Sequence, residues 1–317
     1  MILIITNKND ITTDFVVKKL NLLNLEYYRL NTEDLLSNIG INFDFTNDTF
    51  ELYDKNLNKT VNLLKEVDSV YFRRPLLPNL KQFCLKKKEE NFIEKELYYT
   101  LEGLYSILEN KFWISKPNNI RIAENKILQL QVAKDIGFQI PVSLLSNSKK
   151  NEIAFTNKHN SIIKPIKSGV VYEDDKNINL IYTAPINKKD LLNNNSKFPA
   201  YLQEAISPKT DVRVTVVGNK VFAAKIIYDN LNKIDWREID SKNIKYEEYV
   251  LPENITNKCI QIVQKFNLMF GAIDLAINKN EKYIFFEINP NGQWAWLEKN
   301  LGQNISEEIV NLLMNRG

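Results

Sequence analysis

The residues best suited to chemistry lie in two short apolar segments, 271–277 and 283–289, that a polar turn separates. Asp274 interrupts the first segment, and Glu287 and Asn289 stand in the second. Because successive side chains of a strand alternate between its faces, Glu287 and Asn289 are expected to point the same way. The pattern therefore predicts a buried antiparallel hairpin that carries three oxygen donors.

Carboxylates in such apolar surroundings are costly to bury unless another charge compensates them. Mg²⁺ prefers oxygen ligands, and proteins commonly hold it with one or two carboxylates together with substrate phosphates. We therefore predict that Asp274, Glu287 and Asn289 bind Mg²⁺ that accompanies a nucleotide. The alternative is that the two carboxylates lie at strand ends and face solvent, which gives the same sequence pattern.

Basic residues accompany other predicted strands. Arg73 and Arg74 follow the strand at 69–72, where a guanidinium can bind a carboxylate or a phosphate, and solvated surface charges are the alternative. Lys164 ends another strand. The Lys-Ser-Gly sequence at 167–169 suggests a phosphate loop, but the full P-loop pattern G-x-x-x-x-G-K-[ST] is absent from the chain.

A second hairpin is predicted around the Gly-Asn-Lys turn at 218–220. Asp211, Arg213 and Lys225 alternate with apolar residues in its two strands. We expect these three side chains to share one face and to line a cleft, and a solvated sheet face is the alternative. Arg237 follows a tryptophan shortly after this hairpin.

The segments that must position these residues form an α/β pattern. Residues 1–6 and 26–30 are predicted strands on either side of a helix at 11–23. The turn at 7–10 contains no glycine, so the dinucleotide fingerprint G-x-G-x-x-G is absent and a Rossmann cofactor site is excluded. Further helices are predicted at 86–111, 123–136, 253–266 and 305–314. We predict three domains, at 1–115, 116–200 and 201–317.

Composition excludes several classes of protein. Of the 317 residues, 44% are hydrophobic and 26% charged, as in ordinary globular proteins. The 42 basic and 39 acidic residues give a net charge of +3, which is too balanced to indicate nucleic-acid binding. No apolar run approaches the ~20 residues of a membrane helix, and the start lacks the basic segment of a signal peptide. We expect a cytoplasmic protein that does not bind membranes.

The cysteine and histidine content limits the chemistry further. Cys84 and Cys259 lie in unrelated helical patterns, so we expect buried, inert free thiols without a disulfide or a zinc site. His159, the single histidine, lies in a polar stretch, which argues against a Ser-His-Asp triad and a histidine-based metal site.

Taken together, these residues resemble the ATP-grasp superfamily. Two spacings support the resemblance: Asp211 follows Glu204 by seven residues, and Glu287 follows Asp274 by thirteen. The resemblance covers the whole chain. It implies an α/β (α+β) ATP-grasp fold with an N-terminal Rossmann-like pre-ATP-grasp domain, a central domain and a C-terminal grasp domain.

The same resemblance implies ATP and Mg²⁺ as cofactors. Lys126 and Lys164 would hold the phosphates, Glu204 and the backbone of Ile206 the adenine, and Asp211 the ribose. The full set of implied nucleotide and magnesium contacts is Lys126, Lys164, Gln203, Glu204, Ile206, Asp211, Lys225, Asp274, Glu287 and Asn289.

Four longer motifs, at 71–75, 211–215, 235–237 and 287–294, resemble the ATP-grasp ligases that make graspetides, which include the microviridin-type and grasp-with-spasm maturases. Such enzymes join side-chain carboxylates of a ribosomal precursor peptide to hydroxyls or a lysine amine of the same peptide. The resemblance implies a precursor with a leader and with a core that contains Thr, Ser or Lys plus Glu or Asp. Esters and amides both remain open, and so does a homodimer.

This narrower resemblance suggests roles for the arginines. Arg213 and Arg237 are candidates for holding the substrate carboxylate and the acyl phosphate during catalysis. Arg73 and Arg74 are expected to bind the core peptide from the first domain.

Three alternatives remain for the function. The nearest is an ATP-grasp ligase for a small molecule or a protein tail, such as a glutamate-adding or dipeptide ligase. The second is a nucleotide-binding regulator without catalysis, for which a full set of metal ligands would be surplus. The third is a phosphotransferase, whose product would gain the mass of a phosphate, whereas each macrocyclisation removes one water.

Overall fold

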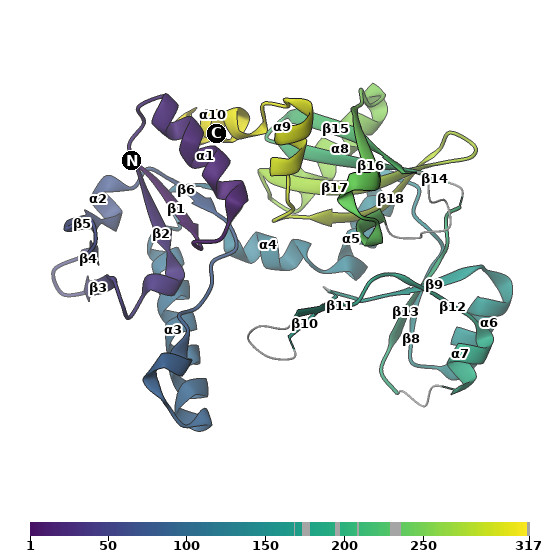
Figure 1. The fold of residues 1–317 in the computed structure, drawn as a ribbon, viewed down its shortest axis with the longest axis horizontal. Coiled ribbons are helices and arrows are strands. Elements are labelled where there is room, and N and C mark those ends of the chain that lie inside the picture. The colour runs from purple at the N-terminus through teal and green to yellow at the C-terminus, as the bar shows by residue number, and fades with distance from the viewer. Residues whose placement is uncertain (168, 173–177, 194–196, 208, 229–235, 316–317) are drawn as a thin grey trace.

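The computed structural model describes residues 1–167, 169–172, 178–193, 197–207, 209–228 and 236–315. The N-terminal part lies on one side of the molecule, and a central sheet and a C-terminal sheet lie on the other (Figure 1). The combination of parallel and antiparallel sheets with helices confirms the predicted α/β class. Within the described residues, no helix is long and apolar enough to cross a membrane.

The N-terminal part is built on a parallel sheet in the order β2-β1-β6-β7. The side chains of its central strand β1 are buried on both faces: Leu3 and Ile5 pack toward α3, and Ile2 and Ile4 pack toward α1 and α10. Parallel sheets are normally covered on both faces in this way. The elements of this part are β1 (Ile2–Thr6), α1 (Ile11–Leu22), β2 (Tyr27–Asn31), β6 (Ser69–Phe72), α3 (Lys87–Ile107) and β7 (Phe112–Ile114).

A small antiparallel meander in the order β3-β4-β5 is inserted between β2 and β6. The remaining elements of this region are η1 (Thr32–Asp34), β3 (Ile39–Asp44), β4 (Thr49–Asp54), β5 (Lys59–Asn62), α2 (Leu63–Glu66) and η2 (Leu80–Phe83).

The link to the rest of the chain consists of two helices, α4 (Pro117–Ala123) and α5 (Lys126–Ile136). The single helix predicted at 123–136 is therefore wrong at its start. Asn125 explains the break, because its side-chain oxygen accepts hydrogen bonds from the backbone N–H groups of Ile127 and Leu128 and so begins a new helix.

The central part is an antiparallel sheet in the order β12-β9-β13-β8, and α6 and α7 lie beside it (Figure 1). A separate hairpin of β10 and β11 extends from this sheet (Figure 1). The elements are β8 (Ser143–Ser146), α6 (Lys149–Lys158), β9 (Ser161–Lys164), β10 (Val170–Tyr172), β11 (Ile178–Leu180), β12 (Ala184–Ile186), α7 (Lys188–Asn193) and β13 (Ala200–Glu204).

The C-terminal part is an antiparallel sheet in the order β16-β15-β14-β17-β18, in which both predicted hairpins are confirmed. Its strands are β14 (Lys209–Val217), β15 (Lys220–Tyr228), β16 (Ile244–Glu248), β17 (Phe270–Asn278) and β18 (Tyr283–Asn289). The helical elements that accompany it are η3 (Trp236–Glu238), η4 (Ser241–Asn243), α8 (Glu253–Lys265), α9 (Ala295–Leu301) and α10 (Ile305–Asn315).

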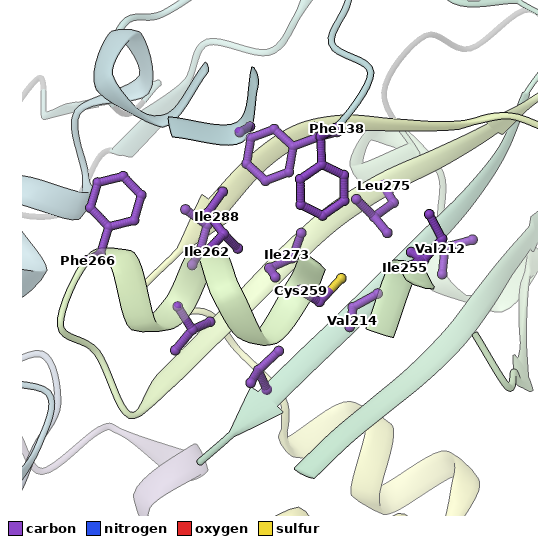
Figure 2. Close-up of a cluster of buried hydrophobic side chains, with 14 of the residues drawn as sticks. Phe138, Val212, Val214, Ile255, Cys259, Ile262, Phe266, Ile273, Leu275 and Ile288 are labelled. Atoms are coloured by element: carbon purple, nitrogen blue, oxygen red, sulfur yellow. The ribbon is translucent and has the colours of Figure 1, made fainter. Parts of the chain in front are cut away.

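Helix α8 covers one face of this sheet (Figure 2). Val212, Val214 and Ile273 from the strands pack there against Ile262 and Cys259 from the helix. The alternate residues of β14 and β17 point to the opposite face. That second face packs against α9 and α10 at one end, and at the other end it is left for polar residues.

The two cysteines are free thiols, as predicted, but only Cys259 is buried, so the expectation of two buried thiols is wrong for Cys84. Cys84 is exposed after η2. Burial raises the pKa of the Cys259 thiol to about 12, because the thiolate loses its hydration.

We predict that iodoacetamide at pH 8 modifies Cys84 and leaves Cys259 unmodified in the folded protein. The thiolate is the reactive form, and burial removes both the thiolate and the access to it at Cys259. Mass spectrometry of proteolytic fragments measures the labelling, and Cys84→Ser is the control that should abolish it. Modification of Cys259 as fast as Cys84 would contradict the burial.

Candidate active site

The three predicted magnesium ligands lie on the same face of the C-terminal sheet. Asp274 stands directly opposite Glu287, and Asn289 follows opposite Ala272, so all three side chains project from one side of the β17–β18 pair. The register shifts after Asp274, and the extra residue in β18 is Phe286. This face is the one that α8 does not cover.

Two adjoining cavities lie beside these residues. The larger has a volume of about 530 Å³ and the smaller about 60 Å³, and Lys164, Thr183 and Glu287 line both. The larger cavity is also lined by Glu124, Lys126, Gln129, Lys167 and Asn289. The smaller is also lined by Glu204, Ile206, Lys209, Asp211, Trp236, Asp274 and Phe286. The cleft therefore lies between the central and C-terminal sheets, where most of the predicted site residues meet.

Each carboxylate of the predicted metal site has a cationic partner. Nζ of Lys126 lies 3.0 Å from Oε2 of Glu287, and Nη1 of Arg213 lies 3.3 Å from Oδ1 of Asp274. Lys126 begins α5, and Arg213 stands directly opposite Asp274 on the neighbouring strand. Because all four side chains are less than one-fifth exposed, these charges interact through a medium that screens them less than water does.

Arg213 is buried, and its ion pair with Asp274 does not complete its hydrogen bonds. Its residue is 7% exposed, and within the described part of the chain Nε and Nη1 donate no hydrogen bond. Buried donors are normally bonded, so an arginine in this state beside Asp274, which lines the smaller cavity, fits an anionic ligand. A carboxylate or an acyl phosphate is an anion of this kind.

Asp211 lines the smaller cavity but is already ion-paired. Nζ of Lys209 donates to both of its carboxylate oxygens, and the hydroxyl of Tyr228 donates to Oδ2 at 2.7 Å. A carboxylate offers about four acceptor positions, so one remains for a ligand hydroxyl. Lys164 lies nearby, with Nζ 5.0 Å from the centre of the Phe286 ring.

Glu204 and Ile206 also lie at the smaller cavity, where an adenine could be bound. Oε1 of Glu204 is 3.8 Å from Nδ1 of His159, so the histidine lies at the rim of the site. Gln203 is fully buried, and its Nε2 donates to the hydroxyls of Ser143 and Tyr201. This arrangement argues against direct contact between the Gln203 side chain and a nucleotide.

The prediction for Lys225 is wrong. In the register of β14 and β15, Lys225 is opposite Val212, whereas Asp211 and Arg213 are opposite Ile226 and Ala224. Lys225 therefore projects from the face that α8 covers. Its Nζ lies 4.3 Å from the centre of the Tyr249 ring.

The prediction that Arg73 binds a peptide is also wrong, because this side chain is 2% exposed and bonded within the protein. Nε lies 2.9 Å from Oδ2 of Asp10, which is itself buried. Nη1 donates to the carbonyl of Gly292 at 3.1 Å, and Nη2 donates to Oε1 of Gln293 at 2.8 Å. Arg73 thus fixes the turn that follows the predicted metal ligand Asn289.

Arg74 lies at the exposed side of the same turn. Its Nε and Nη2 donate to the carbonyl of Asn291 at 3.2 and 3.0 Å. The turn packs closely against β17, because a Cβ at Gly292 would lie 2.3 Å from the Cβ of Ala272. A role of Arg74 in peptide binding stays a prediction. The side chain of Arg237 lies outside the described residues, and so does its predicted role.

The oxygen donors fit a magnesium ion. Within the described residues, no group of three or more His, Cys, Asp or Glu side chains forms a metal site. Asp274 and Glu287 with the amide of Asn289 supply a smaller set, and Mg²⁺ is commonly held by one or two carboxylates while phosphates and waters complete its shell. The cleft and its lysines leave room for such phosphates.

Comparison with known proteins identifies the fold family. Residues 1–121 match the family model of the MvdD pre-ATP grasp domain, and residues 123–313 match that of the RimK-like ATP-grasp domain. The chain belongs to the RimK-like ATP-grasp family. The predicted ATP-grasp fold is therefore confirmed, and the two matches meet at the end of α4. A search of curated protein sequences found no match to the chain.

Solved structures of ATP-grasp enzymes resemble the whole chain. Macrocyclase MdnC from Microcystis aeruginosa MRC, bound with precursor peptide MdnA, is 26% identical with a TM-score of 0.86 and 99% coverage of both chains. A RiPP-associated ATP-grasp ligase from Chryseobacterium gregarium, in complex with ADP and a leader and core peptide, is 25% identical with a TM-score of 0.87, over 100% of this chain and 97% of that chain.

A more distant ligase shares only the fold. The D-Ala:D-Ser ligase VanG from Enterococcus faecalis is 14% identical with a TM-score of 0.60, over 100% of this chain and 99% of that chain. The ATP-grasp architecture is thus common to this chain, to peptide-bound ligases and to a ligase named for small amino acids. The fold alone therefore does not identify the substrate of this chain.

Sequence reasoning missed several residues of this ATP-grasp cleft. Lys209 pairs with Asp211 and lines the cavity, and its position two residues before Asp211 on the same strand would have placed it on the same face. Phe286 points into the cleft only because of the bulge. Asp10 pairs with Arg73, and Gln129 bonds to the backbone of Ile288. These partners lie far away in the sequence, and no local pattern reveals them.

We predict that Glu287→Gln folds but turns over ATP slower by roughly two orders of magnitude, the scale of removing one preorganised electrostatic stabiliser. The substitution keeps the shape and removes the charge that Lys126 contacts and that a bound cation would contact. A coupled assay for ADP release measures the rate. The matched control is Glu281→Gln, in the exposed turn between β17 and β18, which should leave turnover unchanged. Wild-type turnover by the Glu287 variant would remove this residue from the site.

We also predict that Arg73→Met lowers the free energy of unfolding by about 3–5 kcal/mol, because it leaves the Asp10 carboxylate buried without its partner. Urea denaturation followed by tryptophan fluorescence measures the change. Arg74→Met removes a neighbouring exposed charge and should have little effect. Adding Asp10→Asn to Arg73→Met should restore part of the loss, and equal stability of Arg73→Met and the wild type would contradict the assignment.

Proposed function

We propose that this chain is an ATP-grasp peptide ligase of graspetide biosynthesis, which forms ester or amide macrocycles in a ribosomal precursor peptide. The observation that carries the proposal is the full-length similarity to two ligases whose structures contain precursor or leader and core peptides. The partner we propose is a precursor with a leader and with a core that contains Glu or Asp plus Thr, Ser or Lys.

The reaction consists of two transfers. A side-chain carboxylate of the peptide attacks the γ-phosphorus of ATP, the bond to the bridging oxygen breaks, and ADP leaves. A hydroxyl or amine of the same peptide then attacks the carbonyl carbon of the acyl phosphate, phosphate leaves and the attacking group loses its proton. Each ring therefore removes the equivalent of one water from the peptide.

We assign the nucleotide-binding roles according to which cavity of the cleft each residue lines. Lys126 and Lys164 line the larger cavity and would bind the phosphates, because lysines compensate phosphate charge well. Glu204 and the backbone of Ile206 would bind the adenine at the smaller cavity, and Asp211 would use its remaining acceptor position for the ribose. Asp274, Glu287 and Asn289 would hold Mg²⁺, which when bound compensates phosphate charge.

Arg213 supports the choice of a carboxylate substrate. Its guanidinium is buried beside Asp274, which lines the smaller cavity, and within the described residues Nε and Nη1 make no hydrogen bond. A guanidinium can bind a carboxylate with two parallel hydrogen bonds. The same group would stabilise the negative charge of the acyl phosphate. Arg237 is proposed as its companion on the strength of the sequence resemblance, and Arg74 as a peptide contact at the rim.

We predict that Arg213→Lys lowers the rate of macrocyclisation at least tenfold while ATP binding is retained, because lysine keeps the charge but lacks the planar fork. The assay incubates the enzyme with ATP, Mg²⁺ and a candidate precursor, a small Thr- and Glu-rich peptide to be sought in the open reading frames beside its gene. Mass spectrometry follows the successive losses of water. Arg121→Lys, an exposed arginine on α4 that pairs with Glu102, is the matched control.

Three outcomes would change the assignment. Water loss at the wild-type rate in the Arg213 variant would show that this arginine does not hold the substrate carboxylate. If the wild-type enzyme removes no water from the peptide yet consumes ATP with amino acids, a ligase for a small substrate replaces the proposal. A gain of phosphate mass without loss of water would indicate a phosphotransferase.

A further inference from the structure

The side chain of Gln129 makes a two-point hydrogen bond with the backbone of β18. Its Oε1 accepts from the N–H of Ile288 at 3.1 Å, and its Nε2 donates to the carbonyl of Ile288 at 2.8 Å. Nε2 also donates to the carbonyl of Ala123 at 2.6 Å. The residue is 2% exposed, so these contacts are formed away from water.

Ile288 is the residue between two proposed magnesium ligands, Glu287 and Asn289. Within the described residues β18 is the last strand of its sheet, so its outward backbone groups have no neighbouring strand at this position. Buried backbone N–H and C=O groups need partners. The amide of Gln129 supplies one acceptor and one donor, which is what another strand would offer to Ile288.

Lys126 contacts the preceding residue of the same strand. It stands three residues before Gln129 on α5, so the two side chains lie on one face of the helix. Its Nζ is 3.0 Å from Oε2 of Glu287. The first turn of α5 therefore holds two consecutive residues of β18, one through its side chain and one through its backbone.

A fixed backbone at Ile288 determines the directions in which the neighbouring side chains leave the strand. Metal sites require their ligands within narrow limits of position, and the groups that orient the ligands contribute to metal affinity. We propose that Gln129 is a positioning residue for the magnesium site, which holds Glu287 and Asn289 in register without touching the ion. The inference rests on the proposed metal site and does not depend on the peptide substrate.

The test measures metal binding apart from catalysis. Mn²⁺ is titrated into full-length protein with ADP and followed by electron paramagnetic resonance, and calorimetry measures ADP binding in the presence of EDTA. Gln129→Met keeps the length of the side chain and removes its hydrogen bonds. We expect its Mn²⁺ affinity to fall about tenfold, the lower end for losing a group that orients metal ligands, while metal-free ADP binding is unchanged.

Two further variants make the result specific. Gln131→Met, on the same helix, removes an exposed glutamine that bonds only to Asp135 in the described structure, and it should bind Mn²⁺ as the wild type does. Gln129→Asn retains the amide on a shorter side chain that does not reach Ile288. It should reproduce the loss of Mn²⁺ affinity, and it serves as the test variant if Gln129→Met does not fold.

Several outcomes would overturn the inference. Wild-type Mn²⁺ affinity in a folded Gln129 variant would show that the hydrogen bonds do not position the ligands. An equal loss of Mn²⁺ and metal-free ADP binding would indicate general damage to the cleft. If the wild-type protein with ADP binds no Mn²⁺, the metal site itself is wrong and this role falls with it. Failure of macrocyclisation alone, with Mn²⁺ binding intact, would leave the role of Gln129 standing and remove only the proposed peptide substrate.

Discussion

The site depends on the burial of two neighbouring carboxylates on one face of the C-terminal sheet. Asp274 and Glu287 stand opposite each other on β17 and β18. Like charges at directly opposite positions of two strands repel each other unless cations compensate them. The compensation comes from two directions, since Arg213 lies on the adjacent strand and Lys126 lies on a helix from the link between the N-terminal and central parts. The charge balance therefore requires α5 to close against β18.

Other distant parts of the chain also act on β18. Gln129 bonds the backbone between the two ligand positions, and Arg73 with Asp10 holds the turn that follows Asn289. The N-terminal part supplies none of the proposed metal ligands, yet its buried ion pair fixes the end of the strand that carries two of them. Electrostatic stabilisation works best when its groups are held in place before the substrate arrives, and contacts of this kind provide that rigidity.

Local patterns predicted most of the fold and the position of the metal-site hairpin. Alternation in each strand placed Glu287 with Asn289 and Asp211 with Arg213 correctly. It did not place Lys225, because the two-residue turn at 218–219 pairs odd-numbered residues of β14 with even-numbered residues of β15. The predicted turn at 218–220 is one residue longer than the observed one, and the register of a hairpin follows from the length of its turn.

The sequence did not reveal contacts between residues that lie far apart in the chain. Two adjacent arginines at a strand end suggested two exposed ligand-binding groups, but the strand turns Arg73 inward to Asp10 and leaves Arg74 outside. Gln129 looked like one polar residue among several on a helix, and its role depends on the unpaired edge of a strand far along the chain. Such residues are recognised only once the tertiary structure brings their partners together.

The pairing of charges in the cleft also bears on how the proposed ligands would enter. Lys126 and Arg213 now neutralise Glu287 and Asp274. A bound divalent cation would take over that compensation, and both basic side chains would then be available for the anionic phosphates and the substrate carboxylate. Binding under this scheme exchanges partners among side chains that are already held in place. The ordering of flexible groups is a large part of the free-energy cost of association, so a cleft whose cations are positioned by its own carboxylates lowers that cost before any ligand arrives.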